Sequence, residues 1–280
     1  MASNAPLGEF LRSRRLASDP SLAPLPTMGV RRVPGLRREE IAQLAGVSAD
    51  YYARLEQGRQ ATPSDAVLTS LAAALNLDAV ERLHLFNLAH SSSTGRGSGT
   101  AARSAQPGLV RLMEAVGDSP AVLHGRGTDV LALNEAARAV ITDFYAKPAG
   151  ERNVVRWFFL DRSSRRFDDW DAVASDVIGM LRLDVGRCPD DVRLRSLVEH
   201  MNTRSPLFAE FWEKQRVSVD VPVRKVIRHP TAGALTFDVV GVSPPSDPDQ
   251  TLFVFTMRTG SPTEKAVARL MAEWRSGPVA

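Results

Sequence analysis

Only one cysteine, Cys188, occurs in the sequence, so an internal disulfide framework is excluded and a reducing cytosol is indicated. The chain also has no run of about 18 apolar residues, so we expect no membrane-spanning helix. The N-terminal stretch MASNAPLGEFLRSRR places its positive charge after its apolar residues, which is the reverse of a secretory signal. Together these absences predict a cytoplasmic protein.

Familiar catalytic patterns are lacking as well. The histidines are scattered without HxxxH or HExxH spacing, at His84, His90, His124, His200 and His229. There is no GxSxG motif, and Cys188 stands in GRCPDD without a neighbouring metal-type ligand. The acids of CPDD (188–191) and DPDQ (247–250) suit turns and helix caps. We therefore expect no enzyme, no bound metal and no cofactor.

The overall composition is ordinary, whereas the distribution of charge is not. Of the 280 residues, 44% are hydrophobic and 24% are charged, which is typical of a globular protein of about two domains. The net charge of +3 says little about partners. Between residues 12 and 38, however, the sole acid is Asp19, and the arginines are Arg12, Arg14, Arg15, Arg31, Arg32, Arg37 and Arg38. Such a cluster suits a phosphate backbone, although a solvated helix face and a basic loop remain the alternative.

The first 90 residues are predicted to form a compact helical domain. Apolar periodicity predicts five short helices, over residues 7–18, 37–45, 48–57, 64–76 and 79–90. The insert between the first two helices, residues 19–36, contains four prolines and cannot continue a helix. After this domain, the Ser- and Gly-rich residues 91–107 are expected to be a flexible linker.

Residues 108–280 alternate between helical and strand-like patterns, so we expect an α+β domain with an antiparallel sheet. The predicted helices cover residues 108–117, 134–144, 168–186, 189–202, about 208–212 and 262–274. The predicted strands cover residues 121–124, 128–134, 217–229, 234–243 and 251–259. The segment HPTAG between two of these strands contains Pro230 and Gly233 and suits a hairpin connection.

Residues 36–58, LRREEIAQLAGVSADYYARLEQG, contain two short apolar-periodic segments that meet at Gly46. Gly46 can adopt the positive φ that such a corner requires, and Ser48 can cap the second helix. The outward positions at the start of the second helix are Ala49, Asp50, Tyr51 and Arg54. A helix that reads DNA presents its side chains at this end. The pattern therefore favours a helix-turn-helix over a simple helical hairpin.

With EEIAQLAGVS followed by YYARLEQGR, this stretch resembles the helix-turn-helix of the xenobiotic-response-element (XRE) or Cro/C1-type repressors. The resemblance implies that Arg38 contacts a phosphate and that Glu56 pairs with an arginine of the first helix, with Arg15 as the candidate. Tyr51 and Arg54 are the candidates for direct base readout. The full set of candidate DNA-binding residues is Arg31, Arg32, Arg38, Ser48, Ala49, Asp50, Tyr51, Arg54 and Arg59.

Two features of this region leave alternatives open. Asp50 can accept a hydrogen bond from a cytosine amino group, or it can simply lie near the positive end of the helix dipole. The insert at residues 19–36 is longer than the short turn of simple repressors. We hypothesise that Arg31 and Arg32 reach backbone phosphates or the adjacent minor groove.

The whole chain resembles XRE-type regulators with a C-terminal MmyB-like domain. The motifs that carry this resemblance are PGLRREEIAQLAGVSADYYARLEQGR, VLALNEAAR, ERNVVRWFFLD, RSPLFAEFW, RHPTAGALTFD and DPDQTLFVFT. The resemblance implies a PAS-like domain that accepts a small apolar molecule, with a fatty acid as the best guess. The family pattern has an aromatic residue where this sequence has Leu133, and this difference affects the expected shape of the ligand site.

The candidate ligand-binding residues are large apolar side chains and two possible anchors for a carboxylate. They are Trp157, Phe158, Met180, Phe208, Phe211, Trp212, Phe237, Arg204 and His229. Arg224, Lys225 and Arg228 are further cations that a carboxylate could use. Each of these residues also has an ordinary interpretation as core, surface charge or turn.

These observations predict a DNA-binding transcriptional regulator that senses a small apolar ligand and binds double-stranded DNA as a homodimer. The alternative is a DNA-binding regulator whose C-terminal domain is a dimerisation or protein-interaction module without a ligand. An enclosed cavity would favour the sensor, and a solid core would favour the interaction module. An enzyme tethered to DNA would need a polar catalytic cluster in that cavity.

Overall fold

The structure is a computed structural model, which describes residues 4–22, 34–59, 62–90, 104–214, 224–244 and 247–276. Arg31, Arg32 and most of the expected linker lie outside these residues. The chain divides into two compact units. The first takes the described residues of Met1–Ser98, Arg182–Arg195 and Glu210–Ser218, and the second takes those of Gly99–Leu181, Ser196–Ala209 and Val219–Ala280.

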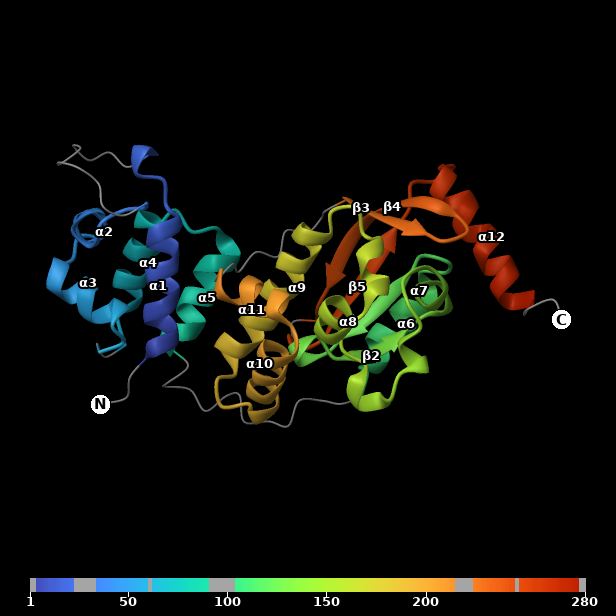
Figure 1. The fold of residues 1–280 in the computed structure, drawn as a ribbon, viewed down its shortest axis with the longest axis horizontal. Coiled ribbons are helices and arrows are strands. Elements are labelled where there is room, and N and C mark those ends of the chain that lie inside the picture. The colour runs from blue at the N-terminus through green and yellow to red at the C-terminus, as the bar shows by residue number, and fades with distance from the viewer. Residues whose placement is uncertain are drawn as a thin grey trace. The chain divides into compact units, whose positions relative to one another are not determined.

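The first unit contains the five short helices expected from the sequence (Figure 1). They are α1 (Ala5–Ala17), α2 (Arg38–Ala45), α3 (Ala49–Glu56), α4 (Asp65–Ala74) and α5 (Ala79–His90). Side-chain oxygens of Asn4, Ser48 and Ser64 accept backbone hydrogen bonds at the starts of α1, α3 and α4. These caps explain where the helices begin, because the first N–H groups of a helix have no partner within it.

A single apolar core joins these helices. Phe10, Leu11, Ile41 and Tyr52 are all fully buried in it, and each comes from the apolar face of its helix. Close packing of α1 on α3 depends on Gly8, because a Cβ there would lie 2.4 Å from the Glu56 carbonyl oxygen. The core therefore fixes the position of α3 relative to α1.

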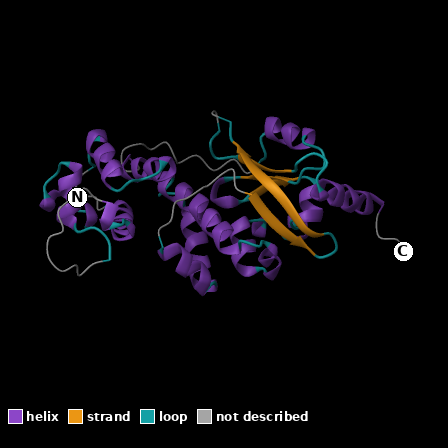
Figure 2. Ribbon diagram, turned by 90° about the horizontal axis from the view of Figure 1, so that it is seen from above, coloured by secondary structure: helices purple, strands orange, loops and turns teal. Residues whose placement is uncertain are grey.

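The second unit is built around a five-stranded antiparallel sheet in the order β2-β1-β5-β4-β3 (Figure 2). The strands are β1 (Ala121–His124), β2 (Val130–Leu133), β3 (Arg224–His229), β4 (Gly233–Val242) and β5 (Thr251–Thr256). The α-helices after α5 are α6 (Pro107–Ala115), α7 (Glu135–Val140), α8 (Val154–Leu160), α9 (Trp170–Arg187), α10 (Val192–Arg204), α11 (Pro206–Glu213) and α12 (Pro262–Ser276). Short 3-10 turns cover Pro20–Leu22, Arg126–Thr128, Phe144–Ala146, Ala149–Glu151 and Arg162–Arg166.

Alternation along the strands gives the sheet two different faces. Leu123, Leu252 and Val254 point to one face and form a core with Leu109 and Met113 of α6. The residues between them in sequence point to the other face, where α8 and α9 contribute their apolar side chains. The face of the sheet opposite α6 is therefore the one that α8 and α9 cover.

The fold class predicted from the sequence is confirmed: a helical N-terminal region precedes a domain with an antiparallel sheet and helices. The HPTAG segment connects β3 to β4, with Gly233 at a positive φ of 74°. The aromatic stretch WFFL lies in α8, which begins after Asn153, whose side chain accepts a hydrogen bond from the Arg156 N–H. No helix in the described parts of the chain combines the length and the apolar character that a membrane crossing requires.

Candidate DNA-binding surface and ligand cavity

The corner between α2 and α3 is shaped by Gly46 and Ser48. Gly46 adopts a φ of 67°, which is left-handed and costs an L side chain free energy. The Val47 N–H donates to the Ala42 carbonyl at 2.9 Å and closes the end of α2. Ser48 Oγ accepts a hydrogen bond from the Tyr51 N–H at 3.1 Å and starts α3. The positive φ of Gly46 and the cap by Ser48 confirm the corner that the sequence predicted, and the Val47 hydrogen bond is an additional contact.

The N-terminal part of α3 presents a polar face to solvent. Ala49, Asp50 and Arg54 are exposed, and Tyr51 is half-buried against the core. Asp50 Oδ2 lies 3.2 Å from Arg54 Nη1, one helical turn away. A pair between two exposed side chains contributes little stability, so the Arg54 guanidinium can exchange Asp50 for a stronger partner. Asp50 is thus an ion-pair partner of Arg54, which is a role that the sequence did not suggest.

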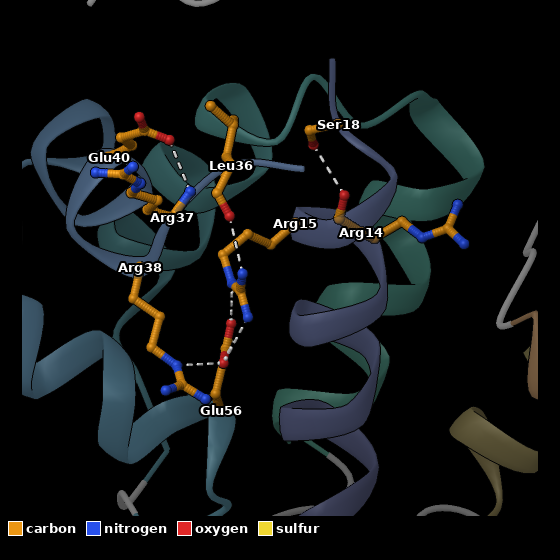
Figure 3. A network of polar contacts seen from close by, with 8 residues as sticks. All are labelled: Arg14, Arg15, Ser18, Leu36, Arg37, Arg38, Glu40 and Glu56. Atoms are coloured by element: carbon orange, nitrogen blue, oxygen red, sulfur yellow. Dashed lines mark hydrogen bonds and ion pairs between the residues drawn. The ribbon is translucent and has the colours of Figure 1, made fainter. Parts of the chain in front are cut away.

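Glu56, at the end of α3, connects the elements around this helix (Figure 3). Its carboxylate accepts hydrogen bonds from Arg15 of α1, at 2.5 and 3.2 Å, and from Arg38 of α2, at 2.7 Å. The Glu56 and Arg15 side chains are 1% and 6% exposed, whereas the Arg38 side chain is 44% exposed. The predicted pair between Glu56 and Arg15 is confirmed, and Arg38 is an additional partner.

Electrostatics within this cluster favour the charged carboxylate. Burial alone would raise the pKa of Glu56, but the hydrogen bonds from Arg15 and Arg38 outweigh burial and lower the pKa below its ordinary value. Burial likewise opposes the charge of Arg15, and the bonds to Glu56 raise the pKa of the guanidinium. The two groups therefore remain charged together over the neutral pH range.

The C-terminal end of the insert is attached to the same cluster. Arg15 Nη1 donates to the Leu36 carbonyl at 2.8 Å (Figure 3). The Leu36 N–H donates in turn to the Arg15 carbonyl at 3.1 Å. A Cβ on Gly35 would lie 2.3 Å from the Arg15 carbonyl oxygen, so only glycine fits here. The Arg37 N–H donates to Glu40 at 2.7 Å and completes the start of α2. Arg38 is thereby positioned at the first residue of α2, with half of its side chain in solvent.

The remaining candidate DNA contacts lie at the edges of this surface. Arg59 is exposed just after α3, and its N–H donates to the Arg54 carbonyl at 3.0 Å. Arg31 and Arg32 fall outside the described residues. The structure thus brings Arg38, Arg54 and Arg59 to the ends and outer face of one helix-turn-helix.

In the second unit, a cavity of about 100 Å³ lies between the sheet and helices α8 and α9. Its walls are almost entirely apolar or aromatic, and they include Val122 and Phe253 from the sheet and Trp157 and Val177 from the helices. An apolar cavity of this kind loses no hydrogen bonds when an apolar molecule enters it.

Comparison with known protein families decides the assignment. Residues 105–271, more than half of the chain, match the family described as the MmyB-like transcription regulator ligand binding domain. The chain belongs to the MmyB-like transcription regulators. Residues 6–85 match a helix-turn-helix domain. A search of curated proteins found no match. The protein is thus a DNA-binding transcription regulator with a ligand-binding domain.

The sequence-predicted ligand residues of this MmyB-like regulator fall into two groups. Trp157, Phe158 and Met180 line the cavity. Phe208 and Phe237 are fully buried and do not line it. The four remaining candidates also lie outside the cavity lining: Phe211, Trp212, Arg204 and His229. Arg204 is exposed at the end of α10, and Phe211 and Trp212 belong to the first unit.

His229 illustrates why a residue near the sheet need not reach the cavity. Its Nδ1 accepts hydrogen bonds from the Thr231 and Ala232 N–H groups, at 3.3 and 3.2 Å, and its Nε2 lies 3.2 Å from the Ala139 carbonyl. One ring nitrogen is therefore engaged in the turn between β3 and β4, and the other contacts the backbone of α7. Burial is the main cause that lowers the pKa of this imidazole.

Several cavity residues of the regulator were not selected from the sequence. They are Val122, His124, Ile141, Phe144, Val154, Phe167, Val173, Asp176, Val177, Val239, Phe253 and Phe255. Lys225 also lines the cavity, and the sequence indicated it only as a further cation for a carboxylate. A usable signal did exist: Val122 and His124, like Phe253 and Phe255, are two residues apart on a strand and so share a face. Register between strands, which the sequence does not give, then brings these pairs together.

Two polar features stand out among these apolar walls. Lys225 Nζ donates to Asp176 Oδ2 at 2.7 Å, and the two side chains are 11% and 20% exposed. His124 lies on β1 with its ring 4.7 Å from that of Phe253. Burial lowers the pKa of His124 to about 4, so its imidazole is neutral at pH 7.

Proposed function

We propose that this protein is a sequence-specific transcriptional regulator whose C-terminal domain senses a small apolar ligand, and that it acts by binding rather than by catalysis. The observation that carries the proposal is the apolar cavity in the domain that follows a helix-turn-helix. A fatty acid is the ligand class that the family resemblance implies, and it is the first to test.

On the DNA side, we propose that α3 enters the major groove and that Tyr51 and Arg54 read bases there. Arg54 is exposed and its partner Asp50 is held only by a solvent-exposed pair. Ala49 and Ser48 come close to the DNA backbone or base edges, and Arg38 binds a phosphate. This division follows from geometry: the start of a recognition helix faces base edges, whereas its neighbours face the backbone.

One short helix reads only a few base pairs, so we propose that the protein binds a two-fold operator as a homodimer. Ligand in the cavity would then alter how two DNA-binding domains are presented to paired half-sites. The free energy for this change must come from a difference in ligand affinity between the two arrangements.

A C-terminal domain that only mediates protein interactions is the alternative function. The cavity supports the sensor, because a domain that acts solely through its surface gains nothing from an interior void and loses packing energy by keeping one. The Trp157, Phe158 and Met180 side chains that line it are also the residue types that apolar ligands require.

The proposal can be tested with delipidated protein and a panel of fatty acids and the corresponding alcohols. We expect mass adducts in native mass spectrometry and a rise in melting temperature that increases with ligand concentration. Absence of both effects for every member of the panel would contradict the ligand claim.

A matched pair of variants makes this test specific. Val239 lines the cavity and is 6% exposed, whereas its neighbour Val240 points to the opposite face and is 41% exposed. We expect Val239→Phe to fill the cavity and abolish stabilisation by ligand. Val240→Phe should leave stabilisation by ligand unchanged. Equal loss of this stabilisation in both variants would mean that the cavity is not the binding site.

A further inference from the structure

The polar groups of the cavity are few and come from different elements. Lys225 and Asp176 face it from β3 and α9, and His124 faces it from β1. Strands β5 and β4 lie between β1 and β3. Adjacent strands are about 4.8 Å apart, so the backbones at these two positions are separated by roughly 14 Å across the sheet. Their side chains nevertheless reach the same cavity, so each position is a separate candidate anchor for a ligand.

The position at Lys225 is already satisfied. Its ammonium group donates to Asp176 at 2.7 Å, so the pair has no net charge. A carboxylate that approached Lys225 would meet the like charge of Asp176 at nearly the same distance. Removing a carboxylate from water is costly unless an opposite charge compensates it, and this pair offers none in excess. The two arginines of β3 are engaged elsewhere: Arg228 pairs with Asp168 and Arg224 with Asp238.

The position at His124 is unsatisfied. Its Nδ1 is buried and has no hydrogen-bond partner among the described residues. The side chain is directed into the cavity at an irregularity in the pairing of β1 with β2, where the register shifts between Leu123 and His124. Such bulges commonly redirect a side chain next to a binding site. A buried nitrogen without a partner is destabilising, and a ligand that supplies one gains that free energy on binding.

We infer that the cavity takes an uncharged ligand of about the size of one aromatic ring, whose hydroxyl or carbonyl group bonds to His124. The inference rests on the proposed sensor function and narrows its ligand from apolar to uncharged. A hydroxyl fits either tautomer of a neutral imidazole, because it can donate to Nδ1 when that nitrogen carries no hydrogen and accept from Nδ1 when it does. The volume of about 100 Å³ is smaller than the roughly 150 Å³ of a cavity that holds benzene, so one aromatic ring is the upper limit on the size of the ligand.

A carboxylate ligand would have to bring a proton with it. With a pKa of about 4, His124 is protonated in roughly one molecule in a thousand at pH 7. Binding of an anion at this position would therefore strengthen as the pH falls, whereas binding of an alcohol would not. The pH dependence of binding therefore distinguishes an alcohol from a carboxylate ligand at His124, independently of their affinities at any one pH.

The test uses three molecules of nearly equal shape: toluene, benzyl alcohol and benzoate. Calorimetric titration of the full-length protein at pH 7.5 gives their dissociation constants. We expect benzyl alcohol to bind roughly 2- to 12-fold more tightly than toluene, which corresponds to one neutral hydrogen bond. We expect benzoate to bind at least about tenfold more weakly than the alcohol, because its charge is not compensated.

Two histidine variants assign the effect to one side chain. His124→Phe keeps an aromatic ring in the cavity and removes both ring nitrogens, so the alcohol should lose its advantage while toluene binds as before. His200→Phe changes an exposed histidine of α10 and should alter neither value. The His124 Cε1–H resonance should also shift on addition of benzyl alcohol.

Each outcome has a distinct meaning. Benzoate that binds as tightly as the alcohol, or an alcohol advantage that survives His124→Phe, would overturn the inference while leaving the sensor function intact. Failure of all three molecules, together with binding of a fatty acid, would likewise overturn the inference alone. Failure of the aromatic molecules and of the whole lipid panel would remove the proposed sensor function as well.

Discussion

At the scale of single residues, the most consequential side chain in the first unit is Glu56. It is almost completely buried and compensates the buried charge of Arg15, while Arg38 completes its hydrogen bonding from the surface. The net contribution of a buried ion pair is often small, but loss of one partner leaves the other uncompensated. The cluster therefore matters less for total stability than for the cost of disrupting it.

Replacement of Glu56 by glutamine should reveal this asymmetry. The variant keeps the shape of the side chain but leaves the Arg15 guanidinium without a counter-charge, so we expect the free energy of unfolding of the first unit to fall by about 3 kcal/mol. Urea denaturation measures this free energy of unfolding, and hydrogen exchange of α1 and α3 assigns the loss to the first unit. Glu39→Gln, which alters an exposed carboxylate of α2, should change stability by less than about 0.5 kcal/mol.

His124 should make the stability of the second unit depend on pH. Its folded pKa of about 4 lies below the ordinary value of 6.5, and burial is the cause. The unfolded state therefore takes up the proton first, and stability is lost as pH falls from 6.5 towards 4. The loss attributable to this group is at most about 3 kcal/mol. The Lys225 and Asp176 charges that share the cavity do not contribute to the shift.

Urea unfolding at several values between pH 7 and pH 4.5 checks this expectation. His124→Phe should reduce the pH dependence of the stability of the second unit. His200→Phe, which replaces an exposed histidine, should leave this pH dependence unchanged. An unaltered slope in His124→Phe would mean that the imidazole is not desolvated in the folded state.

At the scale of elements, α3 and its corner form a unit whose residues have separable tasks. Gly46 and Ser48 set the angle and the start of the helix, Glu56 fastens its end, and Arg54 remains exposed between them. Rigid support from α1 and α2 means that substitutions on the outer face should alter recognition without altering the fold.

Arg54 and Arg38 should therefore differ in the kind of DNA-binding defect they cause. We expect Arg54→Ala to cost about 1–3 kcal/mol on the preferred operator and to relax specificity at one base pair. Arg38→Ala should weaken binding to all sequences alike and reduce the slope of log affinity against log salt by about 1. Selection of operators from a random library, followed by fluorescence anisotropy at several salt concentrations, distinguishes the two. A uniform loss for Arg54→Ala would contradict a role in readout.

Sequence was informative about the elements of the first unit because their determinants are local. Caps, corner glycine and apolar spacing all lie within a few residues of one another, and the Glu56–Arg15 pair followed from a well-defined motif. The cavity was not predictable in the same way, because it depends on the register of five strands. His124 is inconspicuous in the sequence and becomes a cavity residue only when Val122 pairs with Phe253. Phe208 and Phe237 have the composition expected of a ligand site but pack into the core.

At the scale of the whole molecule, the proposed regulator requires coupling between ligand and DNA. Coupling free energies between sites are typically 1–3 kcal/mol, or roughly 5- to 150-fold in affinity, and they are reciprocal. The protein should therefore bind its operator and its ligand with affinities that depend on each other by the same factor.

One factor is measured by titrating the protein with operator DNA in the presence and absence of saturating ligand. The other is measured by titrating the protein with ligand in the presence and absence of operator DNA. We expect them to agree within error, and we expect Val239→Phe to abolish both while Val240→Phe keeps them. Ligand binding that leaves operator affinity unchanged would separate the cavity from regulation.

The double attachment of Leu36 to Arg15 has a consequence for how this protein can diversify. The helix α1 ends at Ala17, two residues after Arg15, and the chain returns to Arg15 at Leu36, so the two ends of the insert lie close together. Loop-closure entropy changes by only about 0.6 kcal/mol for each doubling of length. We therefore expect that the number of residues between Ala17 and Leu36 can be changed at little cost to the stability of the helices on either side.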